Sequence, residues 1–259
     1  MSLREVTSEL DGNLNRLAEK LRSNLRISIL TGAGISAASG IPTFRGQEGL
    51  WKKYRPEDLA TLDAFDTNPV LVWKWYAWRR ERIVTSQPNR GHHVLATWSE
   101  RINSFCLITQ NVDGLHERAG THGVIRFHGS IWELQCRNKC PESPDSWWDD
   151  TVPFRSIPPT CPYCHGLARP GVTWFGESID HEILRQSLSA TDCDIFFAIG
   201  TSAIVNPAAN LIRQAKQNGA FTIEINVDAT PASDLVDLAF HGPAATILEQ
   251  IEQRLTRCP

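Results

Sequence analysis

Four short, mostly apolar runs constrain the fold of this chain more than any other feature. Each is followed by glycine or a polar residue, and they cover residues 27–31, 105–109, 195–199 and 221–225. Strands that are apolar on both faces suit a parallel sheet covered by helices on both sides. Helical patterns lie between them: Asn68-Pro69 and Asn206-Pro207 open two helices, and a last one covers roughly residues 244–257. This alternation predicts an α/β fold with a doubly wound, mostly parallel, Rossmann-like sheet.

Residues 133–170 interrupt the alternation, because they hold seven prolines and little periodicity. We expect a small inserted module here, within a Rossmann-like domain of residues 1–132 and 171–259. Two close cysteine pairs, Cys136/Cys140 and Cys161/Cys164, match the ligand spacing of a tetrahedral zinc site. Two reduced, unliganded pairs are the alternative, but so proline-rich a segment does not fold on a core of its own. Four thiolates leave no open coordination position, so the zinc would be structural.

The composition limits the partners. Hydrophobic residues make up 41% and charged residues 21%, as in ordinary globular proteins, and a net charge of −3 implies no general attraction to nucleic acid. No apolar run reaches the ~20 residues of a membrane span. The first residues include acidic side chains and no apolar signal core, so we expect no presequence and an intracellular protein of unresolved compartment. The sequence does not predict an oligomeric state.

A glycine loop, Gly32-x-Gly34-x-x-Ala37, follows the first strand directly. Its glycines permit a tight turn and let backbone N–H groups approach a pyrophosphate. An ordinary turn between strand and helix would explain the same pattern. Because no acidic residue ends a second strand about 20 residues later, the loop predicts a nucleotide but not a common dehydrogenase.

Several motifs resemble those of the sirtuins in order and spacing. They are GAGIS with AASGIPTFRG, TQNVDGLHERAG, the FHG around His128, Gly200-Thr201-Ser202, and Trp174-Phe175-Gly176-Glu177. The resemblance runs from about Leu25 to the end of the chain. Sirtuins are NAD-dependent protein lysine deacylases, so it implies NAD as co-substrate and acylated lysine side chains of proteins as partners. The implied products are free lysine, nicotinamide and O-acyl-ADP-ribose.

The resemblance also implies a role for each matching residue. His128 would be the general base. The loop from Gly32 to Trp51 would cover NAD, with contacts from Gly32, Ala33, Gly34, Ser36, Thr43, Phe44 and Arg45. The nicotinamide and its ribose would meet Gln110, Asn111 and Asp113. The phosphates and the adenosine would meet Gly200, Thr201, Ser202, Asn226, Val227, Asp228 and Ala244. Gly176 and Glu177 would bind the substrate backbone, and the four cysteines would form the zinc ribbon of the family.

Tyr76 and Arg79 are three residues apart on a helix and therefore share one face. An arginine beside a phenol can bind a carboxylate through charge-assisted hydrogen bonds. In isolation such a pair is more often a core ring beside a solvated charge. Within the sirtuin frame, the pair and Thr43 resemble the class III branch, which removes succinyl, malonyl and glutaryl groups. We expect the neighbouring Arg80 to be a surface charge.

Three other functions stay open. The first is a general deacetylase in which Arg79 faces solvent, and the second is an NAD-consuming ADP-ribosyltransferase or hydrolase. The third is a module that binds NAD or acyl-lysine without turnover. His128, Asn111 and Asp113 together argue against the third function, since binding alone needs no base.

Overall fold

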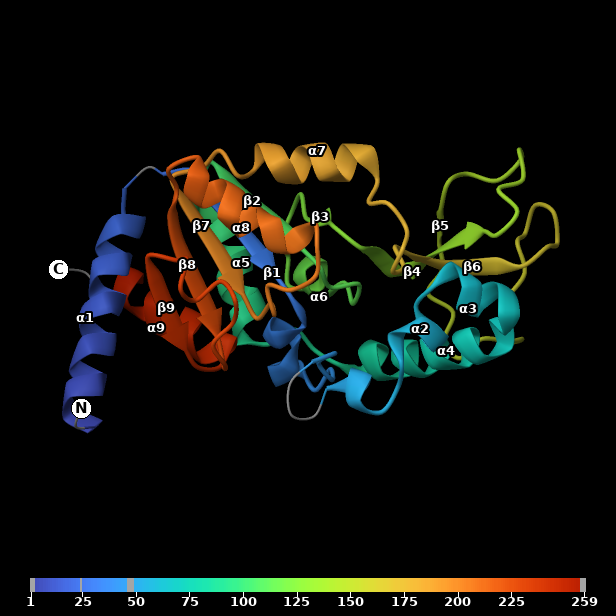
Figure 1. The fold of residues 1–259 in the computed structure, drawn as a ribbon, viewed down its shortest axis with the longest axis horizontal. Coiled ribbons are helices and arrows are strands. Elements are labelled where there is room, and N and C mark those ends of the chain that lie inside the picture. Colours follow the sequence, from blue (N-terminus) through green and yellow to red (C-terminus); the bar gives the residue numbers. More distant parts are fainter. Residues whose placement is uncertain (1–2, 24, 46–48, 257–259) are drawn as a thin grey trace.

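A parallel sheet forms the larger part of the molecule, which is described here by a computed structural model covering residues 3–23, 25–45 and 49–256 (Figure 1). In the described residues its strand order is β3-β2-β1-β7-β8-β9. The strands are β1 Ile27–Thr31, β2 Phe105–Thr109, β3 Ile125–Arg126, β7 Ile195–Ile199, β8 Phe221–Asn226 and β9 Leu238–His241. Strand β1 pairs in parallel with β2 on one side and β7 on the other. The predicted doubly wound sheet is therefore confirmed, while β3 and β9 were not predicted.

Helices cover both faces of this sheet, which explains the continuous apolar runs. Helices α1 (Leu3–Leu21), α5 (Arg90–Arg101) and α9 (Ala244–Thr256) pack on one face, and α7 (His181–Ser189) and α8 (Ala208–Gln217) on the other. Within β7, Phe197 belongs to the first core and its neighbour Phe196 to the second. Both side chains are fully buried, and each burial contributes about 2 kcal/mol.

Local signals fixed the helix starts that the sequence indicated. The Asn68 side chain accepts a hydrogen bond from the backbone N–H of Leu71 at 3.0 Å, and α4 (Pro69–Thr85) begins with proline in its first turn. Helix α8 follows Asn206-Pro207 as predicted. The last predicted helix is α9, which covers Ala244–Thr256; residue 257, its expected end, lies outside the described part. No helix among the described residues is long and apolar enough to cross a membrane.

The smaller part combines an antiparallel ribbon with three helices (Figure 1, right). The ribbon has the order β5-β4-β6, with β4 Gly129–Cys136, β5 Trp147–Trp148 and β6 Ala168–Val172. Helices α2 (Pro56–Leu59), α3 (Leu62–Thr67) and α4 share one core with it. The remaining short helices are η1 Ala33–Ser39, η2 Leu50–Lys52 and α6 Leu115–Arg118. The predicted insert supplies the ribbon, and a distant segment of sequence completes its core; the domain boundaries themselves stay a prediction.

The expectation that Arg80 is a surface charge is wrong. Its side chain is 1% exposed and pairs with Asp149 at 2.5 Å, and its Nε donates to the Ile131 carbonyl at 2.8 Å. Its guanidinium also stacks over the rings of Trp132 and Phe154. Arg80 therefore joins α4 to the ribbon. The sequence of α4 alone could not show that the ribbon covers this side chain.

Replacing Asp149 should destabilise the fold, because Arg80 would keep its buried charge without a carboxylate partner. We expect Asp149→Ala to lower the free energy of unfolding by about 3 kcal/mol, measured by urea denaturation. Arg82→Gln, at an exposed position of the same helix, should change it by less than about 0.5 kcal/mol. Equal effects of the two substitutions would contradict a structural role for the Arg80–Asp149 pair.

Candidate active site

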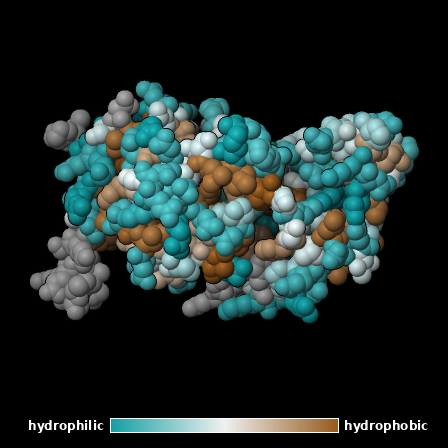
Figure 2. Space-filling model, turned by 45° about the horizontal axis from the view of Figure 1, so that its top comes forward, coloured by the Kyte–Doolittle hydropathy of each residue, from teal (hydrophilic) through white to brown (hydrophobic). Residues whose placement is uncertain are grey.

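The carboxyl ends of β1, β2, β7 and β8 open into a cleft of about 440 Å³ that the ribbon and α4 close from the opposite side. Figure 2 shows apolar surface gathered around a hollow in the middle of the molecule. Most predicted site residues line this cleft: Gly32, Ala33, Gly34, Thr43, Phe44, Arg45, Tyr76, Arg79, Gln110, Asn111, His128, Gly176, Glu177, Gly200, Thr201, Ser202, Asn226 and Asp228.

Four of the residues predicted to bind NAD do not line the cleft. Ser36 and Asp113 are buried and hydrogen-bonded to each other behind Asn111. Val227 is 63% exposed, and Ala244 is buried at the start of α9. Residues 46–48 of the predicted covering loop lie outside the described residues. The cofactor roles of the predicted residues, whether they line the cleft or not, stay predictions.

Glycines bring two strand ends into backbone contact at the switch point of the sheet. Gly34 N donates to Gly200 O at 2.8 Å, and a Cβ on Gly34 would lie 2.7 Å from the Gly200 Cα. Gly200 has a φ of +60°, and a Cβ there would lie 2.5 Å from Ile35 N. No side chain fits at either position. The crevice of a doubly wound sheet at such a switch point is where nucleotides bind.

A buried polar network fixes the orientation of Asn111. Its amide nitrogen lies 3.1 Å from the Gly32 carbonyl oxygen and 3.3 Å from Ser36 Oγ, and donates to both. Ser36 Oγ in turn donates to Asp113 at 2.8 Å, and the other Asp113 oxygen accepts from Leu115 N at 2.9 Å. Burial raises the pKa of Asp113. Ser36 and Asp113 therefore position Asn111 from behind rather than line the cleft themselves.

His128 lies in the cleft in the form that a general base requires. Its Nδ1 is 3.2 Å from the Gln110 carbonyl oxygen, which can only accept, so Nδ1 carries the proton. Burial lowers the pKa of His128, so the ring is neutral at pH 7 and Nε2 is the basic nitrogen. The Gln110 side chain donates to Thr201 Oγ1 at 2.8 Å, so Gln110 links His128 to the residue that follows Gly200 after β7.

Helix α4 turns Tyr76 and Arg79 into the cleft together, as their spacing predicted. Arg79 is 7% exposed, and its guanidinium lies 4.7 Å from the ring centre of Phe44 and 5.0 Å from that of Trp75. Burial lowers the pKa of Arg79 and raises the pKa of Tyr76 to about 12. The Tyr76 hydroxyl accepts a hydrogen bond from Trp174 Nε1 at 2.8 Å. Arg79 does not face solvent.

Some lining residues were not predicted from the sequence. They are apolar or lie in loops beside the matched motifs: Ala60, Trp75, Val112, Ile179, residues 204–207 and residues 229–231. Proximity to Gly200-Thr201-Ser202 and Asn226 was the only signal for the last two groups. Ala60 and Trp75 come from the helical segment whose packing against the ribbon the sequence did not indicate.

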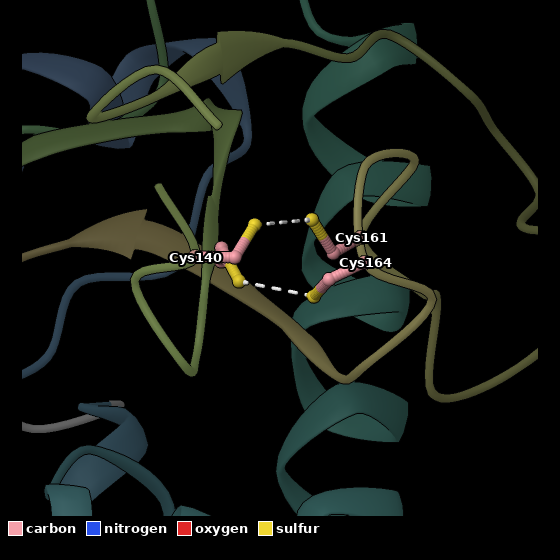
Figure 3. A group of neighbouring side chains, drawn as sticks. Cys140, Cys161 and Cys164 are labelled. Carbon is pink, nitrogen blue, oxygen red and sulfur yellow. Dashed lines mark hydrogen bonds between the residues drawn. The ribbon is translucent and has the colours of Figure 1, made fainter. Parts of the chain in front are cut away.

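The four paired cysteines converge in the ribbon, away from the cleft. Their sulfurs all lie within 4.8 Å of one another, with Cys136–Cys164 at 3.6 Å and Cys140–Cys161 at 3.9 Å. Zinc–sulfur bonds of about 2.3 Å in a tetrahedron place sulfurs about 3.8 Å apart. Figure 3 shows Cys140 facing Cys161 and Cys164 across the space between two loops. None forms a disulfide, and the arrangement fits a structural zinc ion.

A nucleotide crevice with a neutral histidine in it defines a class, the α/β enzymes that act on a bound nucleotide. Comparison with known proteins defines the family. The model of the Sir2 family matches residues 32–207. An NAD-dependent protein deacylase of Aquifex aeolicus is 49% identical over 88% of this chain and 94% of its own length. NAD-dependent protein deacylase 1 of Caldanaerobacter subterraneus is 46% identical over 92% and 97%. The chain belongs to the Sir2 family, which confirms the resemblance to sirtuins.

Solved structures agree with this assignment. A mutant Sir2 homologue in complex with ADP-ribose superposes with a TM-score of 0.85 at 42% identity, covering 94% of this chain and 95% of the other. A Sir2 homologue–NAD complex gives 0.82 at 42% identity, covering 94% and 93%. A complex of Sir2 with a p53 peptide and NAD gives 0.77 at 27% identity, covering 98% of each chain. Use of NAD is thus supported by fold, cleft and relatives together.

Metal analysis should find one zinc ion per chain. Cys161→Ser should release the metal and lower Tm by at least about 10 °C, because binding to the four thiolates stabilises the folded ribbon. Cys106→Ser, in β2 and outside the cluster, should keep the zinc. A stable, zinc-free wild-type protein would contradict the assignment.

The pH profile should report the buried environment of His128. The base must be neutral, so activity is lost as pH falls through its pKa, and burial moves that pKa below the usual 6.5. We therefore expect the acid limb of kcat/KM to have its midpoint below pH 6.5. His128→Ala should abolish turnover without unfolding the protein, whereas the exposed His122→Ala should not. A midpoint above 6.5, or an active His128→Ala variant, would refute this role.

Proposed function

We propose that this chain is an NAD-dependent protein lysine deacylase that prefers acyl groups ending in a carboxylate, such as succinyl, malonyl and glutaryl. As a member of the Sir2 family the chain is an enzyme, and NAD-dependent protein deacylation is the activity named for its relatives. The acyl preference is the finer part of the proposal and rests on the cleft itself.

The observation that carries this preference is the buried charge of Arg79. Among the described residues, no carboxylate lies within ion-pairing distance of its guanidinium, which contacts aromatic rings instead. Asp113 acts on it only through a longer-range Coulombic interaction. Burying a charge without a hydrogen-bonded counter-ion is costly. A ligand carboxylate beside Arg79 and the Tyr76 hydroxyl would supply both the charge and the acceptor atoms.

The remaining residues suit the deacylation chemistry. Asn111, held by Gly32 and Ser36, has a fixed orientation in which to hold the nicotinamide end of NAD. His128 Nε2 is free to take a proton from a ribose hydroxyl, because its Nδ1 proton is committed to Gln110. The segment of residues 172–177, which forms one wall of the cleft, is where we place the substrate backbone. We propose nicotinamide and O-acyl-ADP-ribose as the products.

An assay of acyl preference separates this proposal from its rivals. One lysine peptide carrying acetyl, succinyl or malonyl should be turned over with NAD in all three forms, with a higher kcat/KM for the acidic groups. Equal values would favour a general deacetylase. Release of nicotinamide without loss of the acyl group would favour ADP-ribosyl transfer, and binding without either product a non-catalytic module. An intracellular location is also proposed, because free cysteines grouped for a metal suit a reducing compartment.

Replacing Arg79 should alter selectivity rather than the chemistry. We expect Arg79→Met to lower kcat/KM for a succinyl peptide about 10- to 100-fold, the loss of a charge-assisted hydrogen bond worth about 1.5–3 kcal/mol. Its effect on an acetyl peptide should be less than about threefold. Arg82→Met, on the exposed side of the same helix, is the matched control. Equal losses on both peptides would show that Arg79 is structural.

A further inference from the structure

We propose that Trp174 is a positioning residue for acyl selection: its indole N–H occupies an acceptor site of the Tyr76 hydroxyl and leaves the hydroxyl proton to point into the cleft. This inference rests on the acyl preference proposed above. It adds a residue that acts on the substrate only through Tyr76.

The hydrogen-bonding roles in this pair are fixed by chemistry. An indole N–H can only donate, so at 2.8 Å the Tyr76 oxygen must accept from Trp174. A phenol has one proton and can donate it once. Trp174 is the only hydrogen-bond partner of the Tyr76 hydroxyl among the described residues. The proton is therefore available to a ligand in the cleft that Tyr76 and Arg79 line.

The buried environment of Tyr76 keeps its hydroxyl protonated. Burial raises the pKa of Tyr76 to about 12, so the hydroxyl is a donor throughout the neutral range. A donor bonds more strongly to a carboxylate than to a neutral acyl group, because the bond is then charge-assisted. Orienting the hydroxyl toward the cleft therefore favours acyl groups with a terminal carboxylate over acetyl.

The indole ring is held so that its N–H keeps this direction. The Arg169 guanidinium lies 3.8 Å from the ring centre and forms two bonds to Glu177, at 2.6 and 2.7 Å. The same carboxylate accepts from the backbone N–H of Trp174 at 2.8 Å, and Arg169 donates to the Val172 carbonyl at 3.1 Å. Trp174 is 3% exposed. Contacts other than the one with Tyr76 thus hold both the ring and the backbone of Trp174.

The competing explanation is that Trp174 only fills the core, where its ring lies 5.3 Å from that of Phe65. Trp174→Phe separates the two, since it keeps an aromatic ring and removes the N–H. If Trp174 only fills the core, Trp174→Phe should change KM by the same factor whether or not Tyr76 is present. If Trp174 positions the Tyr76 hydroxyl, its effect on KM for the succinyl peptide should vanish in a Tyr76→Phe background.

A double-mutant cycle tests this. KM and kcat would be measured with succinyl and acetyl peptides at saturating NAD for wild type, Trp174→Phe, Tyr76→Phe and the double variant. We expect each single variant to raise KM for the succinyl peptide about five- to tenfold relative to the acetyl peptide. The double variant should be no worse than Tyr76→Phe alone. Trp78→Phe, on α4 and outside the cleft lining, is the matched control and should change neither KM.

The outcomes separate this inference from the proposed function. If Tyr76→Phe is selective for the succinyl peptide but Trp174→Phe adds to it independently, or affects both peptides equally, the positioning role is overturned and the acyl preference stands. If wild type shows no preference and Tyr76→Phe is not selective, the acyl preference fails and the positioning role fails with it. If Trp174→Phe raises KM for the succinyl peptide selectively, and this effect disappears in the Tyr76→Phe background, both the acyl preference and the positioning role are supported.

Discussion

The close contact between the backbones of Gly34 and Gly200 is the constraint on which the rest of the site depends. It joins the loop after β1 to the end of β7. Between these two neighbouring parallel strands, the direction in which the chain adds strands to the sheet reverses. A single Cβ on either residue would separate them, since the nearest atoms would be 2.5–2.7 Å away. Neighbouring residues of the cleft lie beside this contact: Thr201 follows Gly200 directly, and the Asn111 amide donates to the Gly32 carbonyl at 3.1 Å.

The residues proposed for chemistry and those proposed for selectivity come from different parts of the molecule. The ends of the parallel strands form the crevice and carry His128 nearby, whereas α4 and the segment after β6 supply Tyr76, Arg79 and Trp174. These last three belong to or border the core that the ribbon shares with α2, α3 and α4, and the four-cysteine cluster lies in that ribbon. A structural zinc ion would therefore act on substrate choice indirectly, by keeping the ribbon folded against α4.

The sequence predicted what local patterns determine. Apolar runs between turn residues marked β1, β2, β7 and β8, and Asn68 marked the start of α4, because strand burial and helix capping depend on nearby residues. The motifs also brought most cleft residues together correctly. Contacts between distant segments were beyond such patterns: the packing of α4 on the ribbon, and with it the burial of Arg80 and the hydrogen bond from Trp174 to Tyr76.

Arg79 and Arg80 differ in the partners that the fold provides for their buried guanidinium groups. Both arginines are buried neighbours on α4, and aromatic rings cover both. For Arg80 the chain supplies a carboxylate, Asp149, and a backbone carbonyl. For Arg79 the described residues supply neither, although burial penalises its charge in the same way. The fold thus neutralises one buried guanidinium and leaves its neighbour open toward the cleft, and this difference is what supports the proposal that Arg79 binds an anion arriving with the substrate.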